Sequence, residues 1–176
     1  MKFIQTHLAG AYLIELEKIV DQRGFFARTW CQNEFADKQL NSNFVQCNVS
    51  YNKMRGTLRG MHYQKAPHGE AKLVRVTQGA VYDVIVDLRS DSKTIAQWFG
   101  VELTAENRRA LFVPEGFAHG FITLKDNSEV LYQMSEFFYS SYSAGVRWND
   151  PAFGIKWPIS AKVISERDCK YSDFKL

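Results

Sequence analysis

The middle of the sequence, residues 44–135, is a series of strand-length runs separated by turn residues, with no helix-length amphipathic segment between them. Residues 80–89 show the pattern clearly, because successive side chains of a strand point to opposite faces. One face would carry Tyr82, Val84, Val86 and Leu88, and the other Val81, Asp83, Ile85 and Asp87. Many strands without intervening helices predict an all-β fold of two antiparallel sheets, a sandwich or jelly roll that can hold a ligand between its sheets.

The rest of the sequence gives weaker patterns. Residues 2–6 and 11–19 alternate well enough to be strands, and Asn33–Leu40 is the best helix candidate because it opens with a capping-type Asn. The "KDNS" segment, Lys125–Ser128, separates two alternating runs and is typical of a hairpin turn. Residues 148–176 are rich in turns and aromatic residues, so we expect a segment that covers the core. Without a repeat or a linker, we expect residues 1–176 to form a single domain.

Composition argues against several classes of function. The formal net charge is only +3, and Lys and Arg are scattered among acidic residues, so we expect no nucleic-acid partner. The apolar run Leu8–Ile14 is short, lacks a basic leader and is followed at once by an acidic residue, so we expect neither export nor a membrane span. Cys31, Cys47 and Cys169 form no CxxC pair, which favours reduced thiols and a cytoplasmic protein.

One strand-like stretch, Leu58–Val76, is unusually rich in cationic and imidazole side chains. It contains Arg59, His62, Tyr63, His68, Lys72 and Arg75. A metal site in a strand protein usually takes two ligands from positions i and i+2, but Gly60 and Gln64 stand two residues from His62. Three ligands would require His62, His68 and His119 to converge from separate segments. We therefore expect no metal site.

An acid–base site requires fewer converging side chains than a metal site. It requires a histidine near its natural titration range, a carboxylate that fixes the tautomer and a cation that holds a developing oxyanion, roles that His62, a distant acid and Lys72 could take. His62 could equally be a hydrogen-bonded core histidine and Lys72 an edge residue whose ammonium reaches solvent, and spacing alone leaves both alternatives open.

The strand period adds two hints about these side chains. Lys72 would share a face with Val74 and Val76, and a cation beside two valines favours a pocket over a solvated edge. Arg59 and His62 would point to opposite faces of a regular strand. Both can point inward only if Gly60 marks a bulge or a twist.

Two further segments offer binding residues. In "VPEGFAHGF" the neighbouring Pro and Gly residues predict a loop that presents His119 at the mouth of a pocket, although an ordinary exposed loop histidine fits as well. In "RGFF", Arg23–Phe26, a guanidinium lies beside two aromatic rings, which suits an anion with a planar base stacked above it. The same four residues also suit the end of an ordinary strand.

The motifs, taken in order, are shared with one family. They are "DQRGFFAR", "FVQCNVS", "TLRGMHYQ", "AKLVRVTQGAVYDVIVDLR", "QWFGVELTAEN", "VPEGFAHGF", "VLYQMSEF", "WNDPAFGIKWP" and "ISERD". Nearly end to end, the sequence resembles the dTDP-4-dehydrorhamnose 3,5-epimerases and their relatives, which act on nucleotide-linked 4-ketosugars. The resemblance implies a metal-free, cofactor-independent cupin jelly roll of two antiparallel sheets with a few short helices, usually a homodimer that exchanges strands. It also implies a nucleoside-diphosphate-sugar substrate and a place in surface-polysaccharide or deoxysugar biosynthesis, such as that of O-antigen.

The resemblance implies roles for individual residues. His62 in "RGMHYQ" corresponds to the family's base and Asp168 in "ISERD" to its partner carboxylate. Lys72 in "AKLV" corresponds to the lysine that polarises the 4-keto group, and Tyr132 in "VLYQ" to the tyrosine on the opposite face of the sugar. The residues that fall where the family holds diphosphate, sugar and nucleotide are Arg23, Phe26, Gln46, Asn48, Arg59 and His119.

These roles are chemically consistent. A ketone at C4 acidifies the C–H bonds at C3 and C5, so a base can remove either proton if a fixed positive charge meets the enolate oxygen. His62 would act as the positioned base, an effect of about 10²–10⁴-fold, and Tyr132 would protonate the other face. His68 and Arg75 receive no role and are expected to be peripheral.

Two positions depart from the rhamnose-pathway pattern: Arg28 stands where an acid is common, and Phe138 where a pocket tyrosine is common. These departures leave open a single-centre epimerase acting on a CDP- or GDP-linked ketosugar. A dTDP-sugar 3,4-ketoisomerase, a sugar-nucleotide binding module without catalysis and a metal-dependent cupin enzyme are further alternatives.

Overall fold

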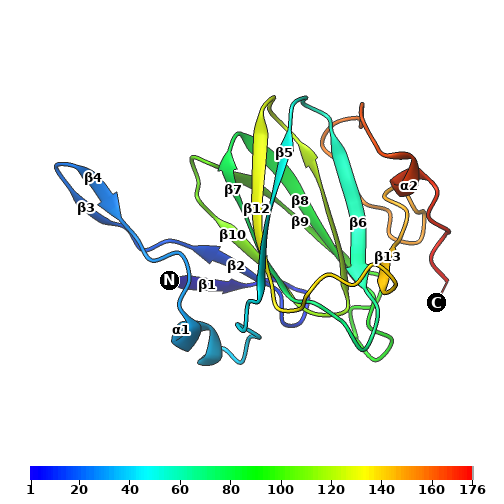
Figure 1. The fold of residues 1–176 in the computed structure, drawn as a ribbon, viewed down its shortest axis with the longest axis horizontal. Helices are drawn as coiled ribbons and strands as arrows, with labels where there is room; N and C mark the ends of the chain where they lie inside the picture. Colours follow the sequence, from blue (N-terminus) through cyan, green and yellow to red (C-terminus); the bar gives the residue numbers. More distant parts are fainter. Residues whose placement is uncertain (176) are drawn as a thin grey trace.

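Two antiparallel β-sheets pack face to face and form the body of the molecule, in a computed structural model that describes residues 1–175 (Figure 1). The six-stranded sheet has the order β1 (Lys2–Gln5), β2 (Tyr12–Glu15), β10 (Ala110–Val113), β7 (Lys72–Gln78), β12 (Ser128–Met134) and β5 (Gln46–Asn52). The five-stranded sheet has the order β13 (Ser143–Gly145), β6 (Leu58–Gln64), β11 (Phe117–Thr123), β8 (Ala80–Asp87) and β9 (Trp98–Thr104). The predicted all-β architecture of two antiparallel sheets is confirmed.

The remaining regular elements are short. Strands β3 (Ile19–Asp21) and β4 (Gly24–Phe26) pair as a hairpin that projects from the body, and α1 (Gln32–Ala36) follows it (Figure 1). Helix α2 (Glu166–Cys169) lies beside β6 near the end of the chain. Within the described residues, no helix combines the length and the apolar character that crossing a membrane requires.

The period-two pattern places side chains as the sequence predicts. Val81 and Ile85 of β8 belong to the core between the sheets, whereas Val84 and Val86 pack in a separate cluster on the outer face of their sheet. On β7, Val74 also belongs to the inner core. The predicted hairpin at "KDNS" is wrong, because β11 and β12, which this turn joins, belong to different sheets and do not pair with each other.

The segment after β13 covers the outer face of the five-stranded sheet. Trp148, Phe153 and Trp157 pack in the same cluster as Val84 and Val86. The Trp157 indole N–H donates to the carbonyl oxygen of Trp148 at 3.0 Å, which ties the segment to itself. This packing brings α2 to β6, and it therefore brings residues from near the end of the chain to the central strands.

The predicted helix Asn33–Leu40 has different bounds in the structure. Helix α1 begins at Gln32 with Cys31 as its N-cap, so Asn33 lies inside the helix and does not cap it. Gln39 adopts a φ of 58°, and the amide of Leu40 donates to the carbonyl of Phe35, which ends the helix early. The predicted strand over 11–19 is likewise split, because β2 ends at Glu15 and β3 begins only at Ile19.

A pair of glycines lets β6 and β11 approach closely. Gly60 has a φ of 136°, and a Cβ atom on it would lie 2.5 Å from the Cα of Gly120. The pairing of the two strands shifts register between His119 and Phe121, directly at this contact. The expected irregularity at Gly60 is therefore confirmed, and it allows Arg59 and His62 to line the same cavity.

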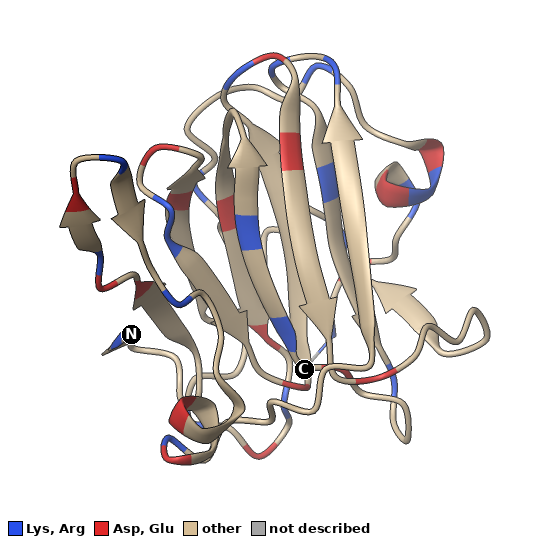
Figure 2. Cartoon of the chain, turned by 60° about the vertical axis from the view of Figure 1, so that its left-hand side comes forward, with Lys and Arg blue, Asp and Glu red and all other residues tan. Residues whose placement is uncertain are grey.

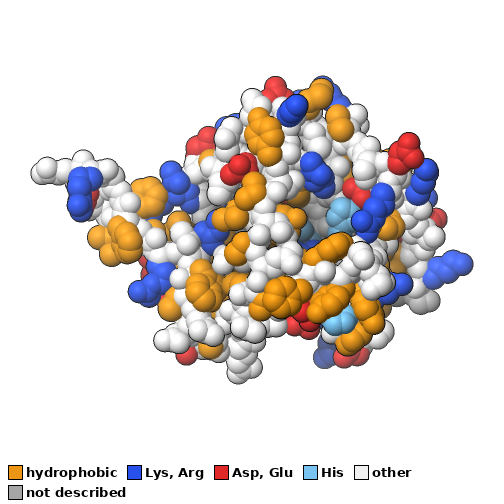
Figure 3. All heavy atoms as spheres, in the orientation of Figure 1, with side chains coloured by type: hydrophobic (Ala, Val, Ile, Leu, Met, Phe, Trp, Pro, Cys, Tyr) orange, Lys and Arg blue, Asp and Glu red, His pale blue; other side chains and the backbone are white. Residues whose placement is uncertain are grey.

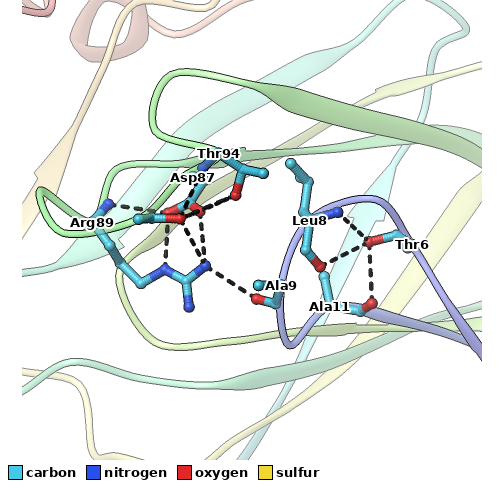
Figure 4. A network of polar contacts seen from close by, with 8 residues as sticks. Thr6, Leu8, Ala9, Ala11, Asp87, Arg89 and Thr94 are labelled. Carbon is cyan, nitrogen blue, oxygen red and sulfur yellow. Dashed lines mark hydrogen bonds and ion pairs between the residues drawn. The ribbon is translucent and has the colours of Figure 1, made fainter.

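A hydrogen-bond network surrounds the buried carboxylate of Asp87, the last residue of β8 (Figure 4). Asp87 accepts hydrogen bonds from Arg89 Nε at 2.9 Å, Ser92 Oγ at 2.5 Å and Thr94 Oγ1 at 2.7 Å. The Arg89 guanidinium also donates to the carbonyl of Ala9 at 3.0 Å, which links this loop to the β1–β2 turn. Burial alone would raise the pKa of Asp87, but these hydrogen bonds outweigh it and lower the pKa to about 2.

Candidate active site

A cavity of about 420 Å³ opens between the sheets, where β5 and β12 face β6. Figure 3 shows this hollow on the face seen in Figure 1, with histidine atoms inside it and basic side chains at its rim. Among the residues that line it are Gln46, Asn48, His62, Glu70, Lys72, Tyr132, Phe138 and Arg167. Two adjoining hollows of about 340 and 190 Å³ share His62 with this cavity and add Arg59, His119 and Asp168. Figure 2 shows that elsewhere acidic and basic residues are interspersed over loops and strands.

The structure pairs His62 with Asp168, as the resemblance implies. The imidazole Nε2 lies 2.7 Å from Asp168 Oδ1, and the backbone N–H of Gly60 donates to Asp168 Oδ2 at 3.2 Å. Burial by itself would raise the pKa of Asp168, but the hydrogen bonds from His62 and Gly60 prevail, and the pKa lies below its ordinary value. Asp168 therefore stays ionised and holds the proton on Nε2, which leaves Nδ1 with the lone pair of a base.

Lys72 is buried, with only 7% of its side chain exposed. Its ammonium lies 2.9 Å from Glu70 Oε1 and 3.4 Å from the carbonyl oxygen of His62. Lys72 lines both the main cavity and the smallest hollow. The expectation that a cation beside valines marks a pocket is confirmed.

Tyr132 reaches the same space from the opposite sheet. It lies on β12, whereas His62 lies on β6, and both line the main cavity and the smallest hollow. Burial raises the pKa of Tyr132 above its ordinary value, with Glu70 adding to the rise and Arg59 opposing it. The phenol therefore keeps its proton at neutral pH, as a proton donor must.

Four of the six predicted binding residues line the cavity or its adjoining hollows, namely Gln46, Asn48, Arg59 and His119. Arg59 is oriented by a hydrogen bond from its Nε to Asn52 Oδ1 at 2.7 Å. Gln46 and Asn48 point from β5 into the main cavity, with Gln46 Nε2 lying 3.4 Å from Asn48 Oδ1. A guanidinium and two amides offer the donors that a diphosphate and a sugar require.

The prediction that a loop carries His119 is wrong. His119 lies within β11 and is only 7% exposed, because the turn-forming Pro114 and Gly116 end their loop before the strand begins at Phe117. Its Nε2 lies 2.9 Å from Oδ2 of the fully buried Asp83. His119 still lines the smallest hollow with Arg59 and Lys72, so it reaches the site from a strand.

The structure does not bring Arg23 and Phe26 to the cavity of their own chain. Both lie on the β3–β4 hairpin, where the Arg23 side chain is 90% exposed and forms an ion pair with Asp21, and Phe26 is 72% exposed. Arg28, one of the two departures, pairs with Glu34 at 2.8 Å near the base of the hairpin. Phe138, the other departure, lines the main cavity.

The other histidine of the Leu58–Val76 stretch, His68, lies outside the site. The ring of His68 stacks on Tyr139 with 3.8 Å between centroids, and neither His68 nor Arg75 lines any of the three hollows. His62 and His119 each have a carboxylate partner of their own. Across residues 1–175, no group of three or more His, Cys, Asp or Glu side chains is arranged to hold a metal ion.

Sequence reasoning missed two acidic residues at this site, Glu70 and Asp83. Each of them could have been found from its position in the sequence pattern. Glu70 stands two residues before Lys72, the spacing of side chains on one face of an extended chain, and Asp83 alternates with valine and isoleucine on a buried strand. An acid on an apolar strand face needs a partner, and the structure supplies His119.

Together these groups form a site for proton abstraction next to a carbonyl. A carboxylate-oriented imidazole can remove a proton, a fixed ammonium can hold the oxyanion that develops, and a phenol from the opposite sheet can return a proton.

Comparison with known proteins agrees with this chemistry. The dTDP-4-dehydrorhamnose 3,5-epimerase family profile matches residues 5–175. The dTDP-4-dehydrorhamnose 3,5-epimerase of Methanothermobacter thermautotrophicus is 46% identical over 171 residues, which cover 95% of this chain and 91% of that protein. The crystal structure of the Bacillus anthracis enzyme, with TDP and PPi bound, is 43% identical with a TM-score of 0.94, and the match covers 98% of this chain and 99% of that one. That of the Legionella pneumophila dTDP-6-deoxy-D-glucose-3,5-epimerase, in complex with dTDP-4-keto-L-rhamnose, is 35% identical with a TM-score of 0.88, covering 95% of this chain and 89% of that one. The chain belongs to the dTDP-4-dehydrorhamnose 3,5-epimerase family.

Proposed function

We propose that this protein inverts C3 and C5 of dTDP-4-dehydro-6-deoxyglucose and so forms dTDP-4-dehydrorhamnose. The observation that carries the proposal is the placement of His62 with Asp168 on one side of the cavity and Tyr132 on the other, with Lys72 between the sheets beside them. The reaction needs no redox cofactor, because only protons leave and return.

In each inversion, His62 Nδ1 removes the proton from the carbon next to the ketone. The bonding electrons move into the enolate, whose oxygen accepts a hydrogen bond from the Lys72 ammonium. Tyr132 gives its proton to the opposite face of the same carbon, which inverts the centre. Exchange with solvent returns the proton to Tyr132 and removes one from His62. Arg59, Gln46 and Asn48 hold the diphosphate and sugar in this scheme, and His119 adds a further contact.

We further propose that the protein acts as a homodimer in which the β3–β4 hairpin enters the partner's cavity. The hairpin projects from the body and exposes Phe26, while the edge strand β5 exposes Val49 and Tyr51 at 57% and 46%. Arg23 and Phe26 would then serve the diphosphate and the base in the other subunit. We place the protein in the cytoplasm, which its three free cysteines support.

The experiment is solvent exchange. The protein is incubated in D₂O with dTDP-4-dehydro-6-deoxyglucose, and NMR follows deuterium at C3 and C5. We expect deuterium at both carbons and a product of rhamnose configuration. Absence of exchange with the dTDP, CDP and GDP ketosugars would refute the whole class, whereas a moved carbonyl would indicate a 3,4-ketoisomerase.

A single-centre epimerase acting on another nucleotide is the second candidate. Phe138 lines the main cavity without the hydroxyl of the tyrosine common at this position. Deuterium at one carbon only, or faster turnover of a CDP- or GDP-linked substrate, would favour this alternative.

A further inference from the structure

Glu70 is the one carboxylate in the main cavity's lining that the proposed reaction leaves without a task. It lies two residues before the start of β7 and is almost fully buried, with 4% of its side chain exposed. Its Oε1 lies 2.9 Å from Lys72 Nζ. A buried carboxylate of this kind is costly to desolvate, so a fold that needed only packing here would be served as well by an apolar residue.

The contact with Glu70 occupies one of the hydrogen-bond donors of Lys72 and so restricts the direction of the others. An ammonium has three N–H bonds. One is directed to Glu70 Oε1 and a second, longer one to the carbonyl oxygen of His62 at 3.4 Å. The third is left for the cavity that Lys72 lines, and the direction of the ammonium is set by a carboxylate on one side and by the backbone of the base on the other.

The second carboxylate oxygen of Glu70 makes no competing hydrogen bond within residues 1–175. Oε2 is buried and has no hydrogen-bond partner among the residues described, so the carboxylate's charge is not shared with another protein donor. Other charged side chains that line the three hollows or pair with their histidines have protein partners of their own: Asp168 binds His62, Asp83 binds His119, and Arg59 binds Asn52. Among the residues described, Lys72 is therefore the one side chain that the Glu70 carboxylate binds directly, although its charge also contributes to the raised pKa of Tyr132.

We propose that Glu70 is a positioning residue that holds the Lys72 ammonium aimed at the oxygen of the enolate. This inference rests on the proposed function, because the enolate is the species that Lys72 meets. Glu70 touches no reacting atom. It acts by fixing the donor before the negative charge appears on the sugar, so that no reorientation is needed when the proton leaves.

Glu70→Gln tests the charge while keeping an acceptor oxygen for Lys72. We expect kcat to fall by roughly tenfold to a hundredfold, the effect of weakening one charge-assisted hydrogen bond in the transition state. KM should change little, because the diphosphate and nucleotide contacts are untouched. Deuterium exchange at C3 and C5 should slow by the same factor, since one lysine serves the oxygen for both carbons.

A double-variant cycle separates positioning from an independent role. In the Lys72→Met background, where slow exchange is followed over long incubations, Glu70→Gln should cause no further loss. A further loss of the same size as in the wild-type background would overturn the proposal, and so would wild-type kcat in Glu70→Gln. If Glu70→Gln does not fold, Glu70→Asp decides, because it keeps the charge but withdraws it by one methylene group. Full kcat in that variant also overturns the proposal.

The matched control is Glu15→Gln. Glu15 pairs with Arg109 at 2.7 Å and lines none of the three hollows, so its loss should leave kcat and KM unchanged. Failure of the underlying function looks different, because the wild-type protein would then exchange no deuterium with any ketosugar.

Discussion

Replacing Asp168 with Asn should disable the base while leaving the cavity in place. The reason lies in the two donors that the carboxylate serves. The backbone N–H of Gly60 donates to Oδ2 at 3.2 Å, so the single oxygen of Asn should lie against Gly60. The NH₂ group would then face Nε2 of His62, which must become the acceptor and move its proton to Nδ1. The nitrogen that should remove the substrate's proton would already carry one.

The expected magnitude follows from two terms. Losing the charge-assisted hydrogen bond at 2.7 Å between His62 and Asp168 costs about 1.5–3 kcal/mol in the transition state, or roughly 10–150-fold in rate. The wrong tautomer adds to this, and in a serine protease triad the corresponding change from Asp to Asn costs about 10⁴ in kcat. We therefore expect kcat to fall by about 10²–10⁴-fold with little change in the affinity for dTDP.

The assay is deuterium exchange at C3 and C5 together with calorimetric titration of dTDP. Asp150→Asn is the control: Asp150 is also a buried carboxylate of the C-terminal segment, and it accepts hydrogen bonds from the amides of Ala152 and Phe174 outside the cavity. It should lower stability but retain kcat. If Asp168→Asn kept more than a tenth of wild-type exchange, the assigned base and its tautomer would both be wrong.

Three further predictions follow from the geometry. The lowered pKa of Asp87, about 2 against 3.8, contributes about 2.5 kcal/mol of stability that is fully present above pH 4 and is lost as the pH falls towards 2; urea unfolding should show this loss in the wild type and not in Asp87→Asn. Tyr132→Phe should still release a substrate proton but fail to invert the centre, so NMR should find deuterium returned with retained configuration; normal inversion would contradict the proposed acid. Arg23→Ala should raise KM. Mixing it with the inactive His62→Ala variant should restore the wild-type KM, because one of the two sites in a mixed dimer then has both Arg23 and His62; no restoration would show that the hairpin serves its own chain.

The strand pattern could be read from the sequence because burial on alternate faces leaves a period of two. That pattern identified β5 to β12 and placed Lys72 beside Val74 correctly. It failed at His119 because Pro114 and Gly116 are turn-forming residues that end before the strand begins, and sequence proximity does not show where a turn stops.

The candidate site could be assembled only in part. The pairing of His62 with Asp168 came from resemblance, since no spacing rule links a strand to a segment 106 residues further along. Glu70 was missed because a carboxylate near a lysine is common on protein surfaces, and only its burial at 4% exposure distinguishes it.

The separation of Asp168 from His62 along the chain also affects the order in which the site is assembled during folding. Both sheets are built from residues up to Gly145, so their strands can pair before the segment that carries Asp168 docks against β6. At that stage the chain would have a cavity, an ammonium and an imidazole, but an imidazole with no fixed tautomer. The proposed catalysis requires the C-terminal segment to dock against β6, so the onset of turnover during refolding would measure this docking step. A protease that cuts between Trp157 and Asp168 would remove the partner of His62 while leaving Trp148, Phe153 and Trp157 on the five-stranded sheet.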